Sequence, residues 1–155
     1  MVQTLVEGLP QIAPNVEVHH VNLSLSGSAA DIGRWQPGKL WSAWRAARRA
    51  IAVARRHGCD ALYYVPAPGK RIALWRDIFI LSQVRPVIPK LILHWHASGL
   101  GQWLETSATA LERRLAHDVL DRADLSIVLA PSLQADANRF RPQSVAIIPN
   151  GIADP

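Results

Sequence analysis

The stretch LILHWHASG, residues 91–99, decides the fold class. It starts as an unbroken apolar run and ends in a Ser-Gly pair that favours a turn. Three other runs have the same character: ALYYV (61–65), LSIVLA (125–130) and VAII (145–148). Strands that are apolar without alternation are typical of a parallel sheet covered by helices. We therefore predict an α/β fold, a Rossmann-like parallel sheet flanked by helices.

Helical segments separate these strands, as parallel pairing requires. The predicted helices span 38–57, 70–84, 106–122 and 132–140, the last with Ser132 as its N-cap. A strand is also predicted over 16–23, and a helix over 1–9 that Pro10 ends. In this fold such a helix usually follows a first, mid-sheet strand. That strand is missing, so we expect residues 1–155 to be one partial domain that is cut at both ends.

Composition and charge narrow the class of function. The single cysteine, Cys59, excludes a disulfide framework and fits a reducing compartment. The net charge of +5 is uneven, because twelve Lys or Arg and two acids give segment 34–90 a charge of +10. Such a segment favours anionic partners, but no DNA- or RNA-binding motif occurs and no nucleic acid is predicted. The first residues lack the basic and apolar regions of a signal peptide, so we expect a cytoplasmic protein.

The segment 37–57 has a two-sided pattern. Its apolar stripe consists of Leu40, Trp41, Trp44, Ala47, Ile51 and Ala54, with arginines on the other side. Burial of this stripe against the sheet is the simpler interpretation. Tryptophans beside arginines are also typical of a helix at a membrane surface. The alternative is therefore that 37–57 contacts an anionic membrane, and that the protein is peripheral on the inner face of the cell membrane.

Two histidines lie at the end of the strand in LILHWHASG. His94 and His96 share one face, and ligands of open α/β sheets bind just beyond the carboxyl ends of the strands. His96 is nearer the loop and is the better candidate for a ligand contact. The alternative is a buried, hydrogen-bonded histidine. A metal site would need a third ligand that the sequence does not mark, so no metal is predicted.

The stretch PAPGKR, residues 66–71, follows another strand. It is not a phosphate-binding P-loop, because Tyr64 replaces the first glycine and Arg71 replaces Ser or Thr. No G-x-G-x-x-G occurs either, so no dinucleotide cofactor is predicted. Lys70 and Arg71 remain candidates for holding an anionic substrate at the start of the next helix, or are solvated surface.

Three stretches in order, LILHWHASG, ADLSIVLAPS and VAIIPNGI, resemble the N-terminal domain of the retaining, GT-B-fold glycosyltransferases of family four, also called group 1. Such domains commonly carry a strand ending in His-x-His-Gly or a relative, an Ala-Asp strand leading to Ser, and a strand ending in Pro-Asn-Gly. The resemblance covers 15–154. It implies that Asn150 and Gly151 form a hinge to a second Rossmann-like domain, absent from this sequence. That domain would hold the nucleotide sugar, with two glutamates seven residues apart.

The resemblance also implies roles for single residues. His96 matches the histidine that approaches the donor sugar, and it would be catalytic through a hydrogen bond or charge stabilisation near the departing phosphate. An Ala-Ser-Gly stretch replaces the glycine that usually follows it, and Ser98 and Gly99 would bind substrate through backbone N–H groups. Arg76 and Asp77 match a charged pair on the acceptor side.

The implied reaction is transfer of a sugar from a nucleoside-diphosphate sugar to an acceptor hydroxyl, with retention at the anomeric carbon. The acceptor would be a glycan or a lipid-linked molecule, the nucleotide sugar is a co-substrate, and no cofactor is implied. This chain would supply the acceptor-side half of the enzyme and would be inactive alone. The alternative is a non-catalytic binding module for an anionic glycan, a lipid or a partner chain.

Overall fold

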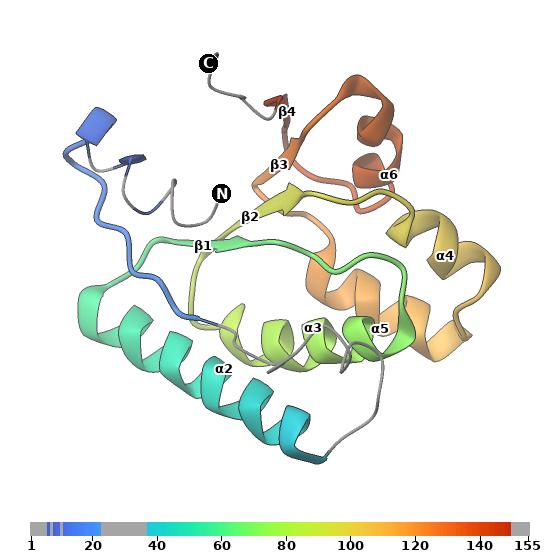
Figure 1. Ribbon diagram of the computed structural model, residues 1–155, viewed down its shortest axis with the longest axis horizontal. Helices are drawn as coiled ribbons and strands as arrows, with labels where there is room; N and C mark the ends of the chain where they lie inside the picture. Colours follow the sequence, from blue (N-terminus) through green and yellow to red (C-terminus); the bar gives the residue numbers. More distant parts are fainter. Residues whose placement is uncertain (1–5, 7, 10, 23–36, 150–155) are drawn as a thin grey trace, which may run out of the picture.

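Four parallel strands form the sheet in a computed structural model that describes residues 6, 8, 9, 11–22 and 37–149 (Figure 1). The strand order is β1-β2-β3-β4, and each strand pairs with its neighbour in parallel. The strands are β1 Ala61–Tyr64, β2 Lys90–Trp95, β3 Leu125–Val128 and β4 Val145–Ile147. The predicted fold class, an α/β domain with a parallel sheet flanked by helices, is confirmed.

Helix α2 Pro37–His57 precedes β1, and the other helices connect successive strands. These are α3 Arg71–Val84, α4 Leu100–Thr106, α5 Ala110–Leu120 and α6 Gln134–Asn138, with a 3-10 turn η2 Pro131–Leu133. Helices α2, α3 and α5 lie together on one side of the sheet, and α4 and α6 lie toward the end to which β2 points (Figure 1). No helix in the described part of the chain is long and apolar enough to cross a bilayer.

The two faces of the sheet differ in burial. Leu93, Trp95 and Val128 are buried on the face that α3 covers, where the Tyr64 hydroxyl also reaches Asp77 of α3. Side chains alternate along a strand, so the residues between them point to the opposite face. There the register places His94 beside Ile127, and Tyr63 beside Ile92. The predicted histidines therefore lie on the sheet face opposite α3.

Helix α2 buries only part of the predicted stripe. Among its described side chains, 41–57, the buried ones are Ala43, Ala46, Ala47 and Ala54, which pack in the direction of α3, and of these Ala47 and Ala54 belong to the predicted stripe. Trp41 and Trp44 are 58% and 38% exposed, so their predicted burial is wrong. The reason is steric: alanines let two helices approach closely, and the larger indole rings then remain on the solvent side.

Other predicted elements also need correction. Residues 16–22 form no strand, because their backbone pairs with no strand in the described part of the chain. Gln11 and Ile12 are helical, beyond the predicted end of the first helix at residue 9, and Pro10 itself lies outside the described residues. The helix predicted over 106–122 is α5, which begins only at Ala110 because Thr109 is its N-cap, and helix α4 before it was not predicted. Ser132 caps nothing through its side chain; it lies inside η2.

Candidate functional site

His94 and His96 lie together at the carboxyl end of β2. The two ring centroids are 4.2 Å apart, with an angle of 37° between the planes. His94 is 7% exposed, and its Nδ1 is hydrogen-bonded to the hydroxyl of Tyr63 from β1. His96 is half-buried. We call His94 and His96 the histidine pair. Alternation along the strand predicts that the two side chains share a face. The contact of His94 with Tyr63 comes from the neighbouring strand and was not predicted.

Burial keeps the histidine pair neutral near pH 7. It lowers the pKa of both imidazoles, and His96 lowers that of His94 further. Burial also raises the pKa of the Tyr63 phenol, which therefore stays protonated and can donate to His94 Nδ1. With that bond formed, the neutral His94 ring carries its own proton on Nε2. This buried Nε2 has no hydrogen-bond partner in the described residues. The arrangement can offer one N–H to a ligand oxygen.

The loop after the histidine pair does not present free amides as predicted. Gly99 has a φ of +92° and begins α4, where an amide would face outward. Its N–H donates to the carboxylate of Asp136 at 3.0 Å, and the N–H of Gly101 donates to the same group at 2.9 Å. Ser98 is exposed. The prediction that the Gly99 amide is open to substrate is therefore wrong, because Asp136 in α6 already occupies it.

Lys70 and Arg71 differ in their contacts, because among the described residues only Arg71 forms an ion pair with a neighbouring helix. Arg71 donates to Glu112 of α5 at 2.8 Å, and its guanidinium lies 5.9 Å from the centroid of the Trp103 ring. Lys70 is exposed at the N-cap of α3. Lys70 is therefore the less engaged of the two predicted anion-binding residues, although the Arg71 side chain is also 55% exposed. Arg71 instead joins α3 to α5.

Arg76 and Asp77 form a pair, as predicted, but inside the fold. Their ion pair is 2.7 Å long, and Asp77 is buried. The Asp77 carboxylate also accepts from the Tyr64 hydroxyl at 2.8 Å and from the Ala67 amide at 2.7 Å. Burial raises the pKa of Asp77, while Arg76 and these donors act against that shift. All acceptor positions face protein groups, so we interpret the pair as holding the loop after β1.

The loops after β1 and β2 pack against each other. A Cβ atom on Gly69 would lie 2.5 Å from the Cβ of Trp103 and 3.1 Å from the carbonyl oxygen of Gly99. Strand β4 ends at the same edge, where the Ile148 amide donates to the Val128 carbonyl. The chain thus leaves the sheet at the edge that carries the histidine pair. The predicted hinge residues, Asn150 and Gly151, lie outside the described residues.

No third metal ligand accompanies the histidine pair in the described part of the chain. Among comparisons with known proteins, no family model matches this chain, and neither does any curated protein or solved structure. The interpretation of the site therefore depends on its residues and on the motifs quoted from the sequence.

Proposed function

We propose that this chain supplies the acceptor-side domain of a retaining glycosyltransferase, which moves a sugar from a nucleoside-diphosphate sugar to an acceptor hydroxyl. The observation that supports the proposal best is the buried, unpartnered Nε2 of His94 beside His96 at the carboxyl end of β2. Buried polar groups normally have partners, and an exception calls for an explanation such as a ligand. Ligands of open parallel sheets bind at this edge.

In this proposal the two histidines have different tasks. His96, half-buried and nearer the loop, hydrogen-bonds the donor sugar or the departing phosphate. His94 donates from Nε2 to a second oxygen, while Tyr63 holds its ring in position. Both rings are neutral, so binding requires no buried charge. A donor aimed at charge that develops in the transition state contributes about 10²- to 10³-fold in rate.

The remaining predicted contacts divide into substrate-facing and structural groups. Lys70 and Ser98 are exposed and are proposed to contact the substrate. Arg71, Arg76 and Asp77 act by shaping the loops through their ion pairs. No step uses a metal or a bound cofactor.

The test is sugar transfer by the full polypeptide that the gene encodes, assayed with a panel of nucleoside-diphosphate hexoses and a lipid extract as acceptor. We expect His96→Ala to lower kcat about 10²-fold or more. His20→Ala, which changes an exposed histidine outside the site, should leave the rate unchanged. Absence of transfer with every donor, an inverted anomeric configuration, or full activity of His96→Ala would each contradict the proposal.

A second candidate function is binding of an anionic membrane through α2, with or without catalysis. The observation that favours it is the exposed, stacked pair Trp41 and Trp44, whose ring centroids are 4.7 Å apart. The Arg48 guanidinium lies 5.7 Å from the Trp44 ring, and Arg45 and Arg49 are also exposed on this helix. Indole rings beside arginines suit an interface between lipid headgroups and acyl chains.

Co-sedimentation with lipid vesicles tests this candidate. We expect binding to phosphatidylcholine vesicles that contain phosphatidylglycerol, weakened by salt and by the double change Trp41→Ala and Trp44→Ala. Leu111→Ala is the matched control, because Leu111 is an exposed apolar residue on another helix. Equal binding to neutral and anionic vesicles, or full binding by the double variant, would eliminate α2 as the membrane contact.

A further inference from the structure

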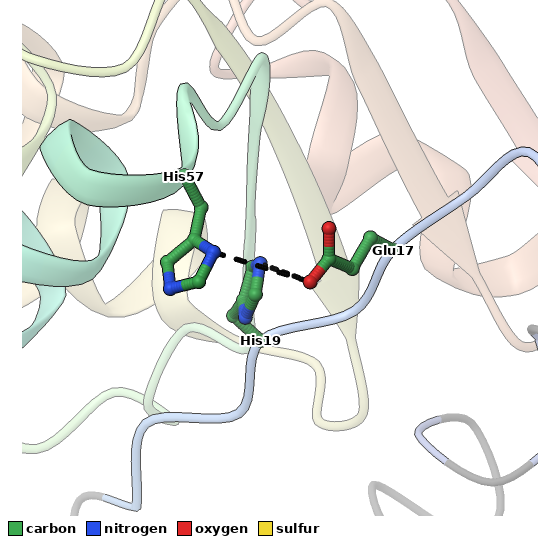
Figure 2. A group of neighbouring side chains, drawn as sticks. All are labelled: Glu17, His19 and His57. Atoms are coloured by element: carbon green, nitrogen blue, oxygen red, sulfur yellow. Dashed lines mark ion pairs between the residues drawn. The ribbon is translucent and has the colours of Figure 1, made fainter.

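A second group of side chains, remote in sequence from the histidine pair, converges near the end of α2. Glu17 and His19 come from the N-terminal segment, and His57 is the last residue of α2. The potential ligand atoms of all three lie within 4.8 Å of one another (Figure 2). We propose that Glu17, His19 and His57 form a site for a divalent transition metal of the zinc class.

The spacing of the ligand atoms fits a small tetrahedral ion. His19 Nε2 and His57 Nδ1 lie 3.2 Å and 3.9 Å from the same atom, Glu17 Oε1. Zinc holds nitrogen and oxygen ligands at about 2.0–2.1 Å, which places neighbouring ligand atoms of a tetrahedron roughly 3.3 Å apart. The two separations from Glu17 Oε1 lie close to this value, and the two imidazole nitrogens, which are within 4.8 Å of each other, would move closer together to bind one ion.

The donor set identifies the class of metal. Two imidazole nitrogens and one carboxylate oxygen suit Zn²⁺, Ni²⁺ or Cu²⁺, whereas Ca²⁺ and Mg²⁺ require mostly oxygen ligands. Three protein ligands leave at least one position for water. The side chains of His19 and His57 are 21% and 34% exposed, and that of Glu17 is 76% exposed. An ion can therefore reach the site from solvent.

The location suggests what the metal would do. A helix C-terminus carries partial negative charge that favours a cation, although Arg55 and Arg56 in the same turn oppose it. The backbone of 17–22 pairs with no strand in the described part of the chain, so no sheet hydrogen bonds hold this segment there. The rings of His19 and His57 are already in contact, with centroids 3.9 Å apart and an angle of 39° between their planes. A bound ion would clip the N-terminal segment to the end of α2.

Calorimetric titration of the protein with Zn²⁺ tests this site. We expect one equivalent to bind, and the Kd to rise more than about tenfold in each of Glu17→Gln, His19→Ala and His57→Ala. His20→Ala and Cys59→Ser are matched controls that remove a neighbouring imidazole and the single thiol; both should keep the wild-type Kd. Circular dichroism confirms that each variant is folded, which is expected because the three side chains are at least partly exposed.

Two further measurements distinguish a specific zinc site from adventitious binding. Zn²⁺ should also raise the melting temperature of the wild type but not of His57→Ala, because a ligand stabilises only the state that binds it. Co²⁺ should give the intense visible bands of four-coordination in the wild type. Equal Kd values in wild type and the three ligand variants would mean adventitious binding only and would overturn the proposal. So would loss of binding in Cys59→Ser.

Discussion

At the scale of single residues, Gly69 shows how tightly the loops at the carboxyl edge of the sheet are packed. A methyl group there would collide with Trp103, because the two Cβ atoms would be 2.5 Å apart and that of Trp103 carries a large indole ring packed against the core. We expect Gly69→Ala to lower the free energy of unfolding by about 1–3 kcal/mol. Urea titration measures this change. Gly8→Ala is the control, since a Cβ at Gly8 meets nothing within 4 Å. A neutral Gly69→Ala would show that the two loops are not packed as described.

At the scale of elements, the start of α5 makes the free energy of unfolding depend on pH in the acidic range. Glu112 is buried and accepts from the Thr109 amide at 2.8 Å, and this bond is the main cause that lowers the pKa of its carboxyl group. Because the pKa is lower in the folded state, the stabilisation is complete above the ordinary value of about 4.3 and is lost as the pH falls through the folded value. We expect Glu112→Gln to lose less of its free energy of unfolding than the wild type as the pH falls below the ordinary value. Urea titrations at a series of pH values measure the difference.

Thr109→Ala provides the contrast for that experiment. It removes the capping hydroxyl, which also donates to the Glu112 carboxylate, but keeps the backbone amide, so it should cost about 1 kcal/mol and weaken the acid dependence without abolishing it. If the free energy of unfolding of Glu112→Gln fell with pH as steeply as that of the wild type, another carboxylate would be the main source of the acid dependence.

Elements differed in how well the sequence predicted them. The four strands were predicted closely, because unbroken apolar runs bounded by Pro, Gly or Asp allow few alternatives. Helix α4 was missed, and α5 was predicted to start at residue 106, although TALE, residues 109–112, is a capping box that marks its true start. The exposed Trp41 and Trp44 could not be predicted from periodicity, because alanine and tryptophan both count as apolar and only packing against α3 separates them.

At the scale of the whole molecule, long-range partners decided which predicted site residues remain available. The histidine pair was predictable, since strand alternation and the carboxyl-edge rule need only local sequence. The engagement of Gly99 by Asp136, 37 residues away, and of Arg71 by Glu112, 41 residues away, was not. Nothing in the local sequence marks either carboxylate as a partner.

Imidazole NMR on the full polypeptide tests the proposal that the histidine pair faces the sugar donor. Long-range proton–nitrogen spectra report tautomer and ligand contact for each ring. We predict a neutral His94 with its proton on Nε2, and saturable shifts of His94 and His96 on addition of the nucleotide sugar that supports transfer. His117, paired with Asp121, should not shift. Unchanged His94 and His96 signals while transfer proceeds would contradict the claim.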